Sequence, residues 1–133
     1  MRDKLCLFVL LLSVYVAPAA AHHSYAMFDR SRELMLSGEV KAWEYSNPHA
    51  WLRLLVRTSD GKLINYGFEA NPPLQLAKLG WRRNTLRPGD KVTVTYQPLR
   101  SGAAGGQLVR VQWADGTRLE AGLPAFTETT PGR

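Results

Sequence analysis

Residues 51–80 read WLRLLVRTSDGKLINYGFEANPPLQLAKLG, and the spacing of their apolar residues changes once, after position 70. Before that point apolar and polar residues alternate, which is typical of antiparallel strands with one face in water. After it the apolar residues recur at helical spacing until Gly80, which favours the end of a helix. The stretch therefore predicts two strands, at 51–58 and 63–69, and then one short helix.

Two local signals mark the turn between the two strands and the start of the helix. Asp60-Gly61 supplies the positive-φ positions of a hairpin turn between the two strands. Asn71 is a favoured helix cap, and Pro72 suits the first helical turn. The helix is thus expected to begin directly after the second strand of the hairpin.

One strand is predicted before this unit, at 34–45. It ends at Asn47-Pro48, because proline has no N–H to donate to a strand ladder. Gly38 permits a bend or bulge within it. The residues expected on its inward face are Leu34, Leu36, Val40 and Ala42.

The rest of the chain adds strands but no second helix. A loop at 81–90, a strand at 91–97, a flexible hairpin loop at 100–107, a strand at 108–114 and a short returning strand at 117–120 are expected. The order β-β-β-α-β-β is the plan of the OB-fold, in which the helix plugs one end of a barrel. We therefore expect an all-β domain with one short helix, a five-stranded antiparallel OB-like barrel over 34–121. Another small β-barrel, or a sandwich capped by a helix, is the alternative.

The start of the chain has the three-part layout of a secretory signal. Two cations precede an apolar run at 5–16, and Ala19–Ala21 forms a small-residue cleavage site. The apolar run is shorter than the roughly 20 residues that a membrane-spanning helix needs. We expect residues 1–21 to be a signal peptide and the mature chain to start at His22. An uncleaved membrane anchor is the alternative.

Cleavage would leave a basic chain without cysteine. The single cysteine, Cys6, lies inside the signal, so the mature chain is expected to have no disulfide and no thiolate metal site. Removing 21 of the 133 residues leaves 112, and the loss of Arg2, Lys4 and Asp3 reduces 17 cations and 11 anions to 15 and 10. A net charge of +5 suits anionic partners or simply solubility, since no long basic run is present. An arm at 22–33 and a tail at 122–133 are expected to flank the barrel.

Four segments of the chain together form a specific pattern. They are AHHSYAMFD at 21–29, LSGEVKAWEYSNPHAWLRL at 36–54, NYGFEANPPLQLAKLGW at 65–81 and LRPGDKVTV at 86–94. In these segments the chain resembles a group of small exported bacterial proteins that is catalogued as a domain of unknown function. The resemblance spans almost the whole mature chain and implies export and a single β-rich domain. It implies no activity, so the residue roles below rest on chemistry.

A metal site is the first candidate function. A chain that starts at His22 offers one ion its α-amine and its imidazole, and a second imidazole completes a three-nitrogen site that suits Cu(II). His49 is the preferred partner because it lies in a loop between strands, and His23 is the alternative partner. Met27 and Asp29 are further candidate ligands. The competing interpretation is that His49 only forms a hydrogen bond near its turn and that His22 and His23 only serve processing.

An aromatic face is the second candidate. Aromatic residues surround the Asn-Pro-His turn and are expected on the barrel face opposite the core, where they suit a sugar, a peptide or a flat apolar ligand. The predicted ligand-binding residues are Trp43, Tyr45, Asn47, Trp51 and Glu69. Alternatively, the N-terminal arm folds over this face and buries it with Tyr25, Met27 and Phe28.

Other function classes have weaker support. An OB-like barrel can bind single-stranded nucleic acid, and Trp51 and Arg53 fit that use, but an exported protein meets little of it. The carboxylates form no catalytic signature with serine or histidine, and the glycine-rich loop at 102–106 lacks the Lys-Ser/Thr of a phosphate loop. The sequence therefore favours a periplasmic or secreted, non-catalytic binding protein. Its expected partner is a metal ion (copper first), a small ligand or an envelope protein.

Overall fold

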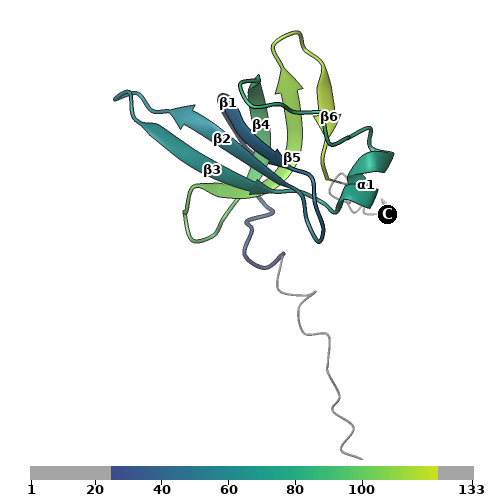
Figure 1. Cartoon of the computed structure of the whole chain (residues 1–133). Coiled ribbons are helices and arrows are strands. Elements are labelled where there is room, and N and C mark those ends of the chain that lie inside the picture. Colours follow the sequence, from purple (N-terminus) through teal and green to yellow (C-terminus); the bar gives the residue numbers. More distant parts are fainter. Residues whose placement is uncertain (1–24, 123–133) are drawn as a thin grey trace, which may run out of the picture.

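The hairpin and the helix predicted from residues 51–80 are both present in the computed structural model, which describes residues 25–122 (Figure 1). Strand β2 spans Trp51–Arg57 and pairs antiparallel with β3, Leu63–Glu69. Helix α1 spans Pro73–Lys78. The other strands are β1 (Leu34–Glu44), β4 (Lys91–Pro98), β5 (Gly105–Trp113) and β6 (Arg118–Glu120).

The strands close into a five-membered barrel of the OB type. The sheet runs β3-β2-β1-β4-β5-β6, and an added pairing joins β3 to β5. The predicted order β-β-β-α-β-β is therefore confirmed. The expectation that every pair is antiparallel is wrong for β3 and β5, which run parallel from Gly67 opposite Gly105 to Glu69 opposite Gln107. An odd number of strands cannot alternate in direction around a closed ring, so one parallel pair is unavoidable.

Two glycines at the start of β5 allow this closure. A Cβ at Gly105 would lie 2.2 Å from the carbonyl oxygen of Gly67. A Cβ at Gly106 would lie 2.1 Å from the carbonyl oxygen of Gln97 in β4. The glycine-rich segment was predicted to be a flexible loop as far as residue 107, yet its last three residues belong to β5. The absence of side chains at Gly105 and Gly106 permits β3 and β4 to approach β5 so closely.

A bulge in β1 exchanges the faces of its last residues. The register with β2 skips Lys41, between the pairs made by Val40 and Ala42. Beyond the bulge Trp43 lies opposite the buried Leu52 and packs against the core. The prediction that Ala42 faces inward is therefore wrong, because the extra residue gives that face to Trp43.

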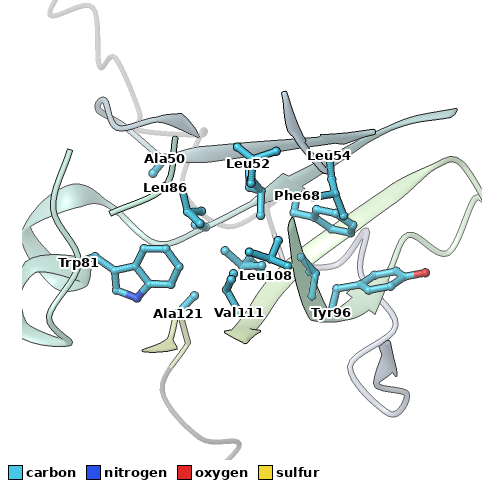
Figure 2. Close-up of a cluster of buried hydrophobic side chains, with 14 of the residues drawn as sticks. Ala50, Leu52, Leu54, Phe68, Trp81, Leu86, Tyr96, Leu108, Val111 and Ala121 are labelled. Carbon is cyan, nitrogen blue, oxygen red and sulfur yellow. The ribbon is translucent and has the colours of Figure 1, made fainter. Parts of the chain in front are cut away.

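The hydrophobic core runs from the helix end of the barrel to the opposite end (Figure 2). Trp81 lies at the helix end and is fully buried, and its indole Nε1 donates a hydrogen bond to the carbonyl of Glu120 at 2.7 Å. Tyr96 lies at the other end, with its hydroxyl directed away from the cluster (Figure 2). Leu76 is the one residue of α1 that is buried in this core.

The helix begins without the predicted side-chain cap. Pro72 holds the cap position, and no side chain caps the helix. The Asn71 amide instead donates a hydrogen bond to the carbonyl of Ala121 at 2.9 Å. Asn71 therefore joins the helix entry to the end of the described chain, and its predicted capping role is wrong.

The described part of the arm is tied to the loop between β4 and β5. Phe28 is buried and forms an isolated bridge with Leu99. The backbone N–H of Arg100 donates to Met27 at 2.9 Å, and its side-chain Nε donates to Ala26 at 3.2 Å. The predicted signal peptide and nearly all of the predicted tail lie outside residues 25–122. Within that range, no helix is long and apolar enough to cross a membrane.

Candidate functional site

His49 is held at the rim of the barrel by the last residues of β3. The loop that carries it joins β1 to β2 and contains a cis Asn47-Pro48 peptide bond. Ala70 donates its backbone N–H to Ala50 at 2.8 Å, which extends the β2–β3 ladder to the residue after His49. The His49 Nδ1 then lies 3.0 Å from the carbonyl oxygen of Ala70 and 3.3 Å from Oε1 of Glu69.

These contacts determine which ring nitrogen of His49 carries a proton. A carbonyl oxygen only accepts hydrogen bonds, so Nδ1 must be the N–H donor. In the neutral ring Nε2 is then the nitrogen with the lone pair. The side chain of His49 is 28% exposed and that of Glu69 is 12% exposed. When the ring is neutral, the pair therefore combines a partly exposed imidazole, with no proton on Nε2, and a largely buried carboxylate.

A second group of charged and aromatic side chains lies beside this pair on the outer face of β2. The Arg53 guanidinium lies 4.8 Å from the ring centroid of Trp51, a cation–π distance. Its Nε also lies 3.2 Å from Oε1 of Glu44. Gly67, opposite Arg53 on β3, leaves the space that this guanidinium occupies, because a Cβ there would lie 2.6 Å from Nη1. We call Glu44, Trp51, Arg53 and Gly67 the arginine platform.

The structure separates the predicted aromatic face into two parts. Trp51 lies on the outer face, next to Glu69 in the ladder. Trp43 packs against Trp81 in a tilted arrangement, at a centroid distance of 5.0 Å, and donates its indole N–H to the carbonyl of Arg82 at 3.1 Å. The Tyr45 hydroxyl donates to the carbonyl of Pro73 at 2.9 Å. Trp43 and Tyr45 therefore support the helix end of the barrel and do not share a binding face with Trp51.

The remaining predicted site residues fall in three places. Asn47 is exposed in the β1–β2 loop. Phe28 is buried against the β4–β5 loop, while Tyr25 and Met27 are exposed, so these three residues do not cover Trp51 as the alternative expected. The predicted metal ligands His22 and His23 lie outside residues 25–122. Among the residues within that range, no group of three or more His, Cys, Asp or Glu side chains is placed to hold a metal ion.

Sequence analysis missed the arginine platform as a unit. Arg53 was considered only as a nucleic-acid contact, and no role was expected for Gly67. The only signal was a glycine in the middle of a strand, which often marks the close approach of another group. That signal does not identify the approaching group. The group is Arg53 of β2, and only the register between β2 and β3 places it opposite Gly67.

Comparison with known proteins gives one match. The model of a family of unknown function, DUF6152, matches residues 10–110. No curated protein and no solved structure matches the chain significantly.

Proposed function

The chain belongs to the family of unknown function DUF6152, and from its site we propose an exported, non-catalytic binding protein that holds a metal ion, copper first, through His49 and the new N-terminus. Localisation in the periplasm or outside the cell is part of this proposal, and so is cleavage before His22. The observation that carries the proposal is the hydrogen bond from Nδ1 of His49 to the carbonyl of Ala70, which leaves Nε2 of the neutral ring without a proton.

A histidine that ligates a metal through one nitrogen usually donates its other N–H to a carbonyl or a carboxylate. The Nδ1 of His49 donates to the carbonyl of Ala70 at 3.0 Å, and Oε1 of Glu69 lies 3.3 Å from the same nitrogen. The hydrogen bond expected near the turn is therefore present, and it leaves Nε2 for a ligand. Glu69 acts in this proposal as a positioning residue that orients the ring.

One imidazole and one carboxylate are too few ligands for a copper site, so the rest must come from His22 or His23. The described chain starts at Tyr25, and the next two residues, Ala26 and Met27, accept hydrogen bonds from Arg100 in the β4–β5 loop. In that loop the carbonyl of Ala104 accepts a hydrogen bond from Gly67 at 3.3 Å, two residues before Glu69. Three residues span up to about 10 Å when extended. This supports an approach of the N-terminus to the β2–β3 side of the barrel.

When bound, Cu(II) would prefer a tetragonal set of nitrogen ligands. The amine and imidazole of His22, with Nε2 of His49, supply three nitrogens. The uncharged His49 ring and the amine must both be free of a proton at the coordinating atom, so binding should weaken as the pH falls.

Titration of the processed protein with Cu(II), followed by electron paramagnetic resonance, tests the proposal. We expect tight binding with nitrogen hyperfine structure, a large loss in His49→Ala, and a loss of about 10-fold or more in Glu69→Gln. An extra residue before His22 should also weaken binding, because it moves the amine. Arg57→Ala, an exposed change on the same strand as Trp51, is the matched control. Unchanged binding in His49→Ala would rule out the site, and the mass of the native mature protein shows whether His22 is its first residue.

The arginine platform favours a second candidate, a module that binds a small polar ligand with a flat face. The β2–β3 face and the β1–β2 and β4–β5 loops form the usual ligand side of OB-folds, although fold alone does not assign a ligand. A neutral oligosaccharide series, followed by nuclear magnetic resonance, tests this candidate. Trp51→Ala should abolish binding with little loss of stability. A large loss of stability would show instead that Trp51 is a structural residue.

A further inference from the structure

A pocket of about 390 Å³ lies at the end of the barrel opposite the helix. The arm, the end of β4 and the β4–β5 loop line it, together with Leu34 of β1, Tyr66 of β3 and Gly105 of β5. Its volume falls in the range of pockets that hold small organic ligands. It shares no lining residue with the His49 pair or with the arginine platform, so the two proposals stand independently.

The floor of this pocket is aromatic and carries two hydroxyl groups. Phe68 lies between the two rings, 6.0 Å from Tyr66 and 4.9 Å from Tyr96 between centroids. Tyr96 is 7% exposed, and its hydroxyl points away from the core (Figure 2). None of the hydrogen bonds found between residues 25 and 122 uses either hydroxyl, and no fully buried side-chain polar atom there lacks a partner. Both hydroxyls are therefore accessible to a ligand.

Two arginines bring positive charge to the same place. Arg32 and Arg100 both line the pocket, and Nη1 of Arg32 lies 4.0 Å from Oδ2 of Asp29, the one carboxylate in the lining. The Asp29 Oδ1 already accepts a hydrogen bond from the Ser31 hydroxyl at 2.6 Å. Arg100 uses Nε to hold the arm, at 3.2 Å from the carbonyl of Ala26, which leaves its terminal nitrogens for other partners. The charged groups of the lining sum to one net positive charge.

The tyrosine hydroxyls suit donation to an anion. Burial raises the pKa of Tyr96, with a smaller contribution from Tyr66, while Arg32 opposes the shift. Tyr96 therefore keeps its proton at neutral pH and can donate it in a hydrogen bond. Tyr66, Tyr96 and Arg32 all line the same pocket.

We propose that this pocket binds a small organic carboxylate. The carboxylate group accepts hydrogen bonds from Arg32, Arg100 and the Tyr96 hydroxyl, and an apolar body packs on the rings of Tyr66 and Tyr96 and on Leu34. Charge-assisted hydrogen bonds of this kind are about twice as strong as neutral ones, and arginine suits carboxylate geometry. The two tyrosine rings and Leu34 in the lining distinguish this site from a simple surface anion site.

Benzoate, benzamide and inorganic phosphate are suitable probes, titrated into the ¹⁵N-labelled protein. We expect benzoate to shift the backbone amide signals of Gly102, Ala103 and Gly105 in a saturable way. Benzamide has the same shape without the charge, so it should bind about 10-fold more weakly or worse. Phosphate lacks the apolar body and should also bind more weakly than benzoate.

Variants identify the groups that hold the carboxylate. Tyr96→Phe keeps the buried ring and should lower benzoate affinity about 10-fold, and Arg100→Gln and Arg32→Gln should each do the same. Tyr25→Phe and Arg118→Gln, whose side chains do not line the pocket, are the matched controls. Benzamide binding as tightly as benzoate, phosphate binding more tightly than benzoate, or no saturable shift at all would overturn the proposal. His49→Ala should leave benzoate binding intact, which separates failure here from failure of the metal site.

Discussion

The guanidinium of Arg53 fills the space that any side chain at position 67 would need. A Cβ built on Gly67 lies 2.6 Å from Nη1 of Arg53, and the same guanidinium lies 4.8 Å from the Trp51 ring centroid. The absent side chain of Gly67 thus sets the position of the charge on this face.

We expect Gly67→Ala to displace Arg53 from Trp51 while changing the free energy of unfolding by less than about 1 kcal/mol. The clashing atom is the end of a flexible side chain, which can move at little cost. Trp51 fluorescence and the Arg53 Nε signal in nuclear magnetic resonance should both change. Arg53→Ala is the control, because it already lacks the guanidinium, and Gly67→Ala added to it should have little further effect on fluorescence. An unchanged Nε signal in the single variant would contradict this account.

Gly106→Ala should behave differently, because the obstacle there is backbone. A Cβ at Gly106 lies 2.1 Å from the carbonyl oxygen of Gln97, the residue before its ladder partner Pro98 in β4. Moving that carbonyl separates β4 from β5 at the point where the barrel closes. We expect a loss of about 2 kcal/mol or more in denaturant unfolding. Gly122→Ala, where the nearest atom is 3.9 Å away, should stay near the wild type.

Asn71 offers a test of its tertiary hydrogen bond against a capping role. Its amide donates to Ala121 at 2.9 Å, and an aspartate cannot replace it as a donor. Asn71→Asp should therefore lose at least as much stability as Asn71→Ala, about 1 kcal/mol or more. A helix cap would give the opposite order, since aspartate is among the best capping residues. Equal stability of Asn71→Asp and the wild type would show that the bond to Ala121 is unimportant.

Local periodicity was enough to place most elements of this fold, and non-local pairing explains the failures. Alternation and the Asp-Gly turn identified β2 and β3 because both signals lie within the segment itself. The bulge at Lys41 left no such signal, since Ala42 and Trp43 are both acceptable on an inward face. Gly38, where a bulge was expected to be possible, instead allows β2 to approach closely. A Cβ at this position would lie 2.5 Å from the carbonyl oxygen of Leu55.

The candidate site was predictable only in part, for the same reason. His49 was selected by its residue type and by its loop. The carboxylate and carbonyl that orient it, from Glu69 and Ala70, come from the far end of the hairpin and are set by register. The expected burial of Trp51 by the arm depended on where Phe28 docks, and that is fixed by its bridge to Leu99.

Trp81 lies in a segment predicted as loop, yet its side chain is the largest fully buried one among residues 25–122. Its indole N–H donates to the carbonyl of Glu120 at 2.7 Å. We expect Trp81→Phe to lose on the order of 2–4 kcal/mol, because it leaves a cavity and an unpaired carbonyl in the interior. Trp51→Phe, on the outer face, should lose far less. Similar losses of stability in the two variants would contradict the assignment of Trp81 as the main core residue at the helix end of the barrel.

The raised pKa of Tyr96 predicts how the stability of the protein changes at alkaline pH. Burial raises its pKa above the usual 10.0, so the folded state holds this proton more tightly than the unfolded state does. Its contribution to stability is complete below pH 10.0 and is lost as the pH rises above that value towards the folded-state pKa. We expect the denaturation midpoint of the wild type to fall between about pH 9 and about pH 11 more steeply than that of Tyr96→Phe. Tyr25→Phe removes an exposed hydroxyl and should keep the wild-type slope. Equal slopes in the wild type and Tyr96→Phe would show that the Tyr96 hydroxyl ionises as easily in the folded barrel as in the unfolded chain, and would thus place it in open solvent rather than in the pocket.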